Sequence, residues 1–86
     1  MNLNEPVVYK CLEAIRDGLR TKSSVSFNDV MGASGCKKFS VKEIGQALEL
    51  LRRNKLVKAS SRFGCSELLE FSATAVTPEG EKLLKA

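Results

Sequence analysis

The chain has 86 residues, 43% hydrophobic and 28% charged, and its formal net charge is +4 at pH 7. This length suits one core, so we expect residues 1–86 to form a single domain, and the composition excludes wholesale disorder. No apolar run approaches the roughly 18 residues that a membrane-spanning helix needs. The start MNLNEPVVYK lacks the basic and apolar regions of a signal peptide. We therefore expect a cytoplasmic protein with no membrane partner.

The chain contains no histidine, which removes the commonest general base and metal ligand. Its three cysteines are widely spaced, which argues against a disulfide framework and against a zinc site. Cys11 lies among apolar helical positions, so we expect it to be buried, whereas we expect Cys36 and Cys65 in exposed loops. No glycine-rich phosphate loop or catalytic motif is present. The sequence thus predicts a protein that is not an enzyme and that uses no cofactor and no metal.

In chain order, the first predicted element is an amphipathic helix that starts near Asn4–Pro6 and ends at Gly18. The segment TKSSVS then predicts a connector or a very short strand around Val25. Ser26 and Asp29 have the spacing of a capping box, so a short second helix is expected to follow.

The central predicted element is a helix over Ser40–Asn54, which begins with a second capping box formed by Ser40 and Glu43. Its apolar side chains lie within an arc of roughly 120°. These residues are Val41, Ile44, Ala47, Leu48 and Leu51. The opposite arc carries Lys42, Gln46, Glu49 and Arg53, with Arg52 at its edge. Because Glu49 stands four residues before Arg53, we expect an ion pair between them.

Residues 56–76 read as two strands joined by the turn FGCSE, and the second strand alternates apolar with polar positions. Thr77-Pro78 then predicts the cap and first position of a short last helix. We expect one core that joins all of these elements. Its predicted members are Leu12, Ile15, Val30, Ile44, Leu48, Leu51 and Phe71.

The positive charge is concentrated in the middle of the chain. Eight of the 14 lysines and arginines lie in residues 37–62, against two acidic residues, so this segment carries +6 and the remainder −2. Such an imbalance is typical of a polyanion-binding face. The alternative interpretation is a solvated surface that keeps a small domain in solution.

The succession of helix, short helix, SVKEIGQALELLRRNKLV, hairpin and VTPEGEKLL resembles the winged helix-turn-helix superfamily of small transcription regulators. The resemblance covers roughly Ser24 to the C-terminus. It implies an α+β fold: a three-helix core with a C-terminal β-hairpin wing and a short final helix. It also implies that helix 40–54 enters the major groove of double-stranded DNA while hairpin 56–76 acts as the wing.

The resemblance suggests a transcription regulator and assigns its DNA contacts. Glutamine pairs with adenine, and lysine or arginine with guanine, so the outer residues of the central helix would contact base edges. The expected base contacts are Lys42, Gln46 and Arg53. The expected phosphate contacts are Lys37, Lys38, Lys58 and Arg62. The protein would act alone or as a homodimer. The alternative is a winged-helix module that binds a protein partner within a larger complex, because one fold hosts many functions.

Overall fold

The computed structural model describes residues 2–64 and 67–85. In these residues the chain forms α1 (Pro6–Gly18), β1 (Val25–Ser26), α2 (Phe27–Met31), a 3-10 turn η1 (Ser34–Cys36), α3 (Val41–Arg53), β2 (Val57–Gly64), β3 (Glu67–Val76) and α4 (Pro78–Lys85). The predicted α+β class is confirmed. None of the helices described has both the length and the apolarity that a membrane crossing requires.

Local side-chain caps set the starts of three helices, as predicted, but the cap expected from Asn4 at α1 is wrong: the N-cap there is Glu5, which makes no side-chain capping bond to a described residue. At α2 the Ser26 hydroxyl accepts a hydrogen bond from the Asp29 amide (3.2 Å), and the Asp29 carboxylate accepts one from the Ser26 amide (2.9 Å). Ser40 and Glu43 make the same reciprocal pair at α3, at 3.1 and 3.0 Å. The hydroxyl of Thr77 caps α4. These contacts satisfy amide groups that have no partner inside the helix.

The end of α3 turns the chain back along its own helix. Lys55 takes a left-handed conformation (φ 59°), and the Leu56 amide donates to the Leu51 carbonyl at 3.0 Å. The Lys55 amide donates to the Arg52 carbonyl at 3.1 Å, which completes a Schellman motif. The Thr77 hydroxyl donates to the Lys55 carbonyl at 2.7 Å. This turn therefore directs β2 alongside α3 and ties it to the start of α4.

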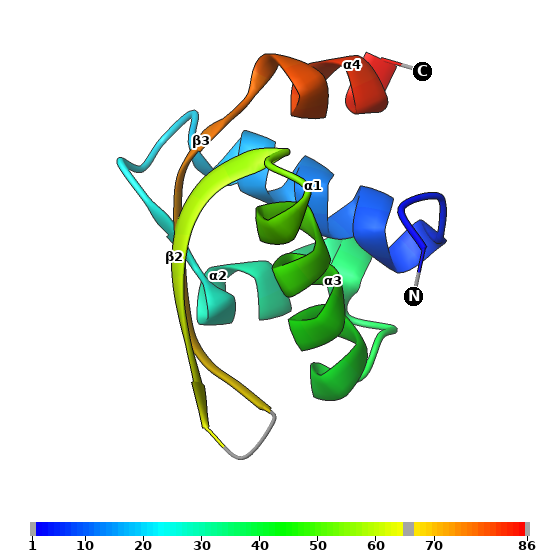
Figure 1. Ribbon diagram of the computed structural model, residues 1–86, viewed down its shortest axis with the longest axis vertical. Coiled ribbons are helices and arrows are strands. Elements are labelled where there is room, and N and C mark those ends of the chain that lie inside the picture. The colour runs from blue at the N-terminus through cyan, green and yellow to red at the C-terminus, as the bar shows by residue number, and fades with distance from the viewer. Residues whose placement is uncertain (1, 65–66, 86) are drawn as a thin grey trace.

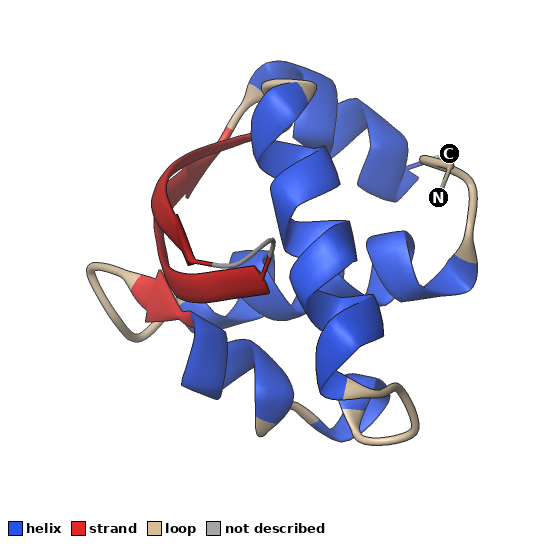
Figure 2. Cartoon of the chain, turned by 60° about the horizontal axis from the view of Figure 1, so that its bottom comes forward, coloured by secondary structure: helices blue, strands red, loops and turns tan. Residues whose placement is uncertain are grey.

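The three strands of the described chain form an antiparallel sheet in the order β1-β3-β2. Val25 and Ser26 pair with Ala73 and Ser72, so the segment predicted as a connector or a very short strand is a strand, and it pairs with the hairpin. The hairpin runs from Val57 to Val76, close to the predicted 56–76. In Figures 1 and 2 the helices α1, α2 and α3 lie together on one side of the curled sheet.

The predicted core residues all have at most 4% of their surface exposed, so that prediction is confirmed. Two apolar residues differ from expectation. Val41, the first residue of α3, is 59% exposed. Cys36 is fully buried, not in an exposed loop, because η1 packs against α1 and the Cys36 thiol donates to the Lys10 carbonyl (3.6 Å). Cys65 lies outside the described residues.

Candidate nucleic-acid interface

One exposed strip of α3 holds the three predicted base-contact residues. Lys42, Gln46 and Arg53 are all exposed, and their spacing places them within about 40° of each other around the helix. We call these three residues the α3 strip. Figure 1 shows α3 at the front of the molecule, with β2 running beside it. The structure thus brings these residues together on an accessible face.

The hairpin covers one flank of this strip and changes the role of Glu49. Glu49 was expected on the exposed polar arc, yet only 7% of it is exposed. The Ser61 hydroxyl of β2 donates to its carboxylate at 3.3 Å. On the same flank Gly45 lies against Phe27 of α2, as well as against Leu68 of β3. Because the hairpin packs over this side, a position that is polar in the sequence is buried in the fold.

The buried Glu49 carboxylate collects hydrogen bonds from both arginines of the last helical turn. Arg52 donates from Nε at 3.0 Å and also from Nη2, and Arg53 donates from Nε at 3.2 Å. The expected pair between Glu49 and Arg53 is therefore confirmed. These bonds, chiefly the one from Arg52, hold the pKa of Glu49 below its ordinary value despite its burial. We call Glu49, Arg52, Arg53 and Ser61 the Glu49 cluster.

The lysines near the start of α3 are available to an external anion. Lys37, Lys38 and Lys42 are exposed, and none of them makes an ion pair within the described residues. The Lys38 ammonium lies 5.3 Å from the centre of the Phe39 ring, a cation–π distance. Two of the four predicted phosphate contacts thus precede the α3 strip directly in the chain.

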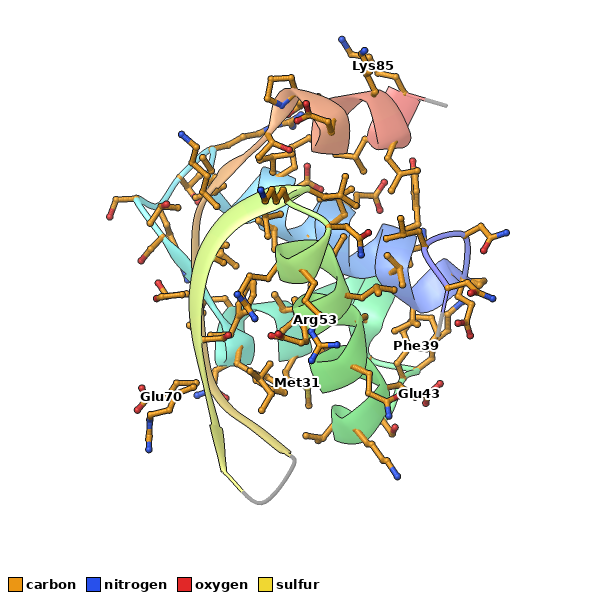
Figure 3. The ribbon with its side chains drawn as sticks, viewed as in Figure 1. Met31, Phe39, Glu43, Arg53, Glu70 and Lys85 are labelled. Atoms are coloured by element: carbon orange, nitrogen blue, oxygen red, sulfur yellow. The ribbon has the colours of Figure 1, made fainter. Side chains whose placement is uncertain are left out.

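The other two predicted phosphate contacts, Lys58 and Arg62, are not brought together with the α3 strip. Side chains alternate along a strand, and Ser61 of β2 faces α3, so Lys58 and Arg62 project from the outer face of the hairpin. Arg62 also forms an ion pair with Glu70 at 3.0 Å. Figure 3 shows Glu70 on the far side of the hairpin from Arg53. The single basic face expected from the sequence is therefore divided in two.

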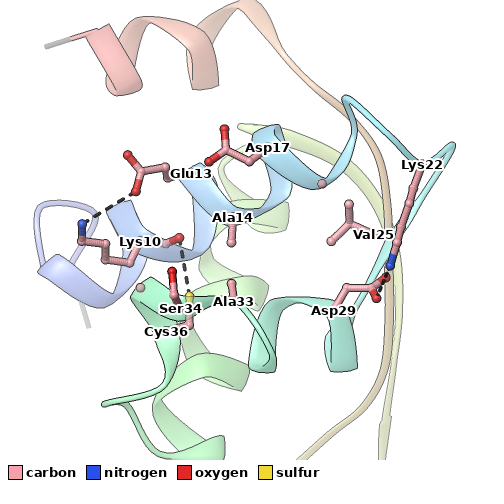
Figure 4. A pocket seen from close by; sticks show the side chains of 12 residues that line it. Lys10, Glu13, Ala14, Asp17, Lys22, Val25, Asp29, Ala33, Ser34 and Cys36 are labelled. Carbon is pink, nitrogen blue, oxygen red and sulfur yellow. Dashed lines mark hydrogen bonds and ion pairs between the residues drawn. The ribbon is translucent and has the colours of Figure 1, made fainter.

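A pocket of about 380 Å³ lies between α1, β1, α2 and η1 (Figure 4). Charged groups on its walls pair with one another: Lys10 with Glu13 at 3.7 Å, and Lys22 with Asp29 at 2.6 Å. Cys36 also lines this pocket, and burial raises the pKa of its thiol. Within the described residues no group of three histidine, cysteine, aspartate or glutamate side chains could hold a metal ion.

Compared with models of protein families, with curated proteins and with solved structures, the chain has no significant match.

Sequence reasoning identified the α3 strip but missed the Glu49 cluster as a structural unit. The only signal available was the spacing of Glu49 from the two arginines, which predicts ion pairs on a helix surface. The spacing along the helix does not predict the contact with Ser61, which lies twelve residues after Glu49 in the chain.

Proposed function

We propose that this protein is a winged-helix domain that binds double-stranded DNA and acts as a transcription regulator. The succession α1, β1, α2, α3, β2, β3 supports the winged-helix interpretation, and so does the pairing of β1 with β3. This order of elements agrees with the winged helix-turn-helix superfamily, which the sequence resembles. In this arrangement α3 is the recognition helix and the hairpin is the wing.

The observation that carries the proposal is the α3 strip itself. Its three side chains combine a lysine, a glutamine and an arginine on one exposed helix face. Lys37 and Lys38, which make no ion pair with any described residue, precede this helix in the chain. These residue types supply hydrogen bonds that match the major-groove edges of guanine and adenine. An α-helix with its side chains, about 10–12 Å wide, fits the major groove. We assign base contacts to Lys42, Gln46 and Arg53 and phosphate contacts to Lys37 and Lys38.

The phosphate contacts expected from Lys58 and Arg62 depend on how far the duplex extends over the protein. They contact phosphate only if the duplex reaches the outer face of the hairpin. Because Glu70 already neutralises Arg62, we expect Lys58 to contribute more than Arg62 to affinity. Contacts of this kind position the protein without reading the sequence.

The test is a fluorescence anisotropy titration against two duplexes, one selected from a random pool and one of random sequence. Lys42→Ala and Gln46→Ala should weaken binding to the selected duplex, Gln46→Ala by about 1–3 kcal/mol at a contacted base pair. Lys85→Ala is the matched control, because Lys85 is an exposed lysine on α4, far from Arg53 in Figure 3. We expect this control to bind both duplexes nearly as the parent does.

Two results would reject DNA binding by α3. One is a parent protein that binds no duplex at low salt, in which case a protein partner becomes the interpretation to pursue. The other is equal loss of affinity in Lys42→Ala and Lys85→Ala, which would show that charge acts without regard to its place in the fold.

A further inference from the structure

We propose that Glu49 is a positioning residue that orients Arg53 to read a guanine base. This inference rests on the DNA-binding function proposed above. It adds a specificity-determining pair and names the base that the pair selects.

The two arginines of the Glu49 cluster are held in different ways. Arg52 uses both Nε and Nη2 on the Glu49 carboxylate, and its side chain is 36% exposed. Arg53 is bound only through Nε, at 3.2 Å, and its side chain is 71% exposed. The two Nη groups of Arg53 have no hydrogen-bond partner within the described residues. Arg53 therefore presents a pair of parallel donors to the outside, whereas Arg52 is largely committed to the fold.

The anchor of Arg53 is itself fixed. The side chain of Glu49 is only 9% exposed, and, apart from Arg53, it is held by Arg52 on α3 and by Ser61 on β2. Fixing Nε restricts the guanidinium plane, so Arg53 loses less conformational freedom when it binds a ligand than an unanchored arginine would. Preorganised donors of this kind favour ligands with two acceptors in one plane.

Guanine fits this donor pair better than phosphate does. Its O6 and N7 atoms are two neighbouring acceptors on one base edge, and bidentate arginine is the commonest specific contact to them. A phosphate also offers two acceptors, but its binding depends on charge attraction, and the Glu49 carboxylate offsets part of the positive charge of Arg52 and Arg53. Lys37 and Lys38 offer phosphates a positive charge with no ion-paired carboxylate in the described residues. We therefore assign the guanine edge to Arg53.

The experiment compares two variants that remove the same charge from α3 but should change DNA affinity in opposite directions. Both Glu49→Gln and Glu43→Gln remove one negative charge from α3, so each should tighten binding to DNA if charge alone matters. Glu43→Gln is the matched control, because glutamine also completes a capping box at that position. On the selected duplex we expect Glu43→Gln to bind at least as tightly as the parent. We expect Glu49→Gln to bind about tenfold more weakly, in line with loss of one bidentate base contact.

A second variant covers the case in which Glu49→Gln unfolds. Arg53→Lys keeps the charge at an exposed position but removes the paired donors, so it should fold and lose about tenfold on the selected duplex. If Glu49 acts through Arg53, the double variant with Glu49→Gln and Arg53→Lys should bind the selected duplex less than about twofold more weakly than Arg53→Lys alone. If Glu49 acts only through the stability of the fold, Glu49→Gln should instead weaken DNA binding by the same factor in the parent and in Arg53→Lys.

The base itself is tested with 7-deazaguanine, which lacks the N7 acceptor. Replacing each guanine of the selected duplex in turn should weaken the parent at one position and leave Arg53→Lys unchanged there. The proposal is overturned if no position shows this pattern, or if Arg53→Lys weakens random and selected duplexes alike, as a phosphate contact would. It is also overturned if Glu49→Gln binds as tightly as Glu43→Gln. Failure of the proposed DNA binding can be distinguished from failure of this inference, because the parent and Glu43→Gln would then bind no duplex.

Discussion

Two buried glycines in helices differ in what a methyl group would meet. At Gly45 of α3, an added Cβ would lie 3.6 Å from both Leu68 Cβ and Phe27 Cζ, which are ordinary contact distances. At Gly80 of α4, it would overlap the Leu56 carbonyl oxygen and lie 2.7 Å from Val76 Cγ1. Only Gly80 is therefore required by close packing, although both glycines are buried.

We predict opposite effects of alanine at these two positions. Gly45→Ala should raise the free energy of unfolding by about 0.5–1 kcal/mol, because alanine favours a helix and the space is sufficient. Gly80→Ala should lower it by about 1–3 kcal/mol, because the backbone of Leu56 must move. Urea denaturation of both variants beside the parent measures the difference. A Gly45→Ala variant less stable than the parent would show that Phe27 and Leu68 leave no room for the methyl group.

At the scale of elements, the Glu49 cluster joins α3 to β2 through a carboxylate that must be ionised. Its pKa lies below the ordinary 4.5, chiefly because Arg52 donates to it. A depressed pKa means that the ionised form is favoured by folding, so the contribution is complete above the unfolded pKa. The contribution is lost as the pH falls through the folded pKa. The junction between helix and hairpin is thus expected to weaken in acid.

We predict that the stability of the parent falls as the pH drops below about 5, and that Glu49→Gln shows a smaller fall over the same interval. The comparison variant is Asp29→Asn, because a hydrogen bond from Lys22 lowers the pKa of Asp29 from 3.8 to about 2. The contribution of Asp29 to stability should therefore be lost between about pH 3.8 and 2, and it depends on the start of α2 rather than on the junction of α3 with β2. Urea midpoints measured from pH 7 to 2 test both variants. Parallel curves for the parent and Glu49→Gln would contradict the assigned role of the carboxylate.

At the scale of the whole molecule, the positive charge counted along the sequence is partly cancelled by ion pairs that form in the fold. Of the cations in residues 37–62, Arg52 and Arg53 share Glu49, and Arg62 pairs with Glu70. The lysines of this segment make no ion pair within the described residues. The lysines, rather than the arginines, are therefore expected to dominate the electrostatic part of DNA binding.

For binding to duplex DNA, we predict a slope of about −2 to −4 for log K against log salt, which corresponds to the two phosphate contacts of Lys37 and Lys38 and up to two more from Lys58 and Arg62. Removing both Lys37 and Lys38 should make this slope shallower by about 2, since each phosphate contact contributes about 0.9. Arg62→Ala should change the slope by less, because Glu70 already pairs with Arg62. Anisotropy titrations at several salt concentrations measure these slopes. Equal slopes for the parent and the double lysine variant would exclude phosphate contacts at the start of α3.

Much of the candidate site could be predicted because it depends on one helix. The period of α3 places Lys42, Gln46 and Arg53 on one face whatever packs against the other, and the structure leaves all three exposed. The relation of this face to Lys58 and Arg62 could not be predicted in the same way. The alternation along β2 places Lys58 and Arg62 on one polar face, opposite Val57 and Ala59, but where that face points relative to the α3 strip depends on how the hairpin packs.

The sequence by itself determined the starts of α2 and α3 and the core, whereas α1 begins after Glu5 without the cap expected from Asn4. Ser26 with Asp29 and Ser40 with Glu43 are three residues apart, so their contacts form within one helical turn and need no partner element. The buried positions follow from apolar periodicity, which gives each helix one face to cover.

Only the tertiary structure decided the pairing of β1 with β3 and the burial of Glu49 and Cys36. Each of these depends on residues far apart in the chain: Val25 pairs with Ala73, Glu49 accepts a hydrogen bond from Ser61, and Cys36 packs beside Lys10. The helical period places a side chain on one side of its own helix but does not reveal which element covers that side. That is decided when the elements pack around one core and the hairpin closes over α3.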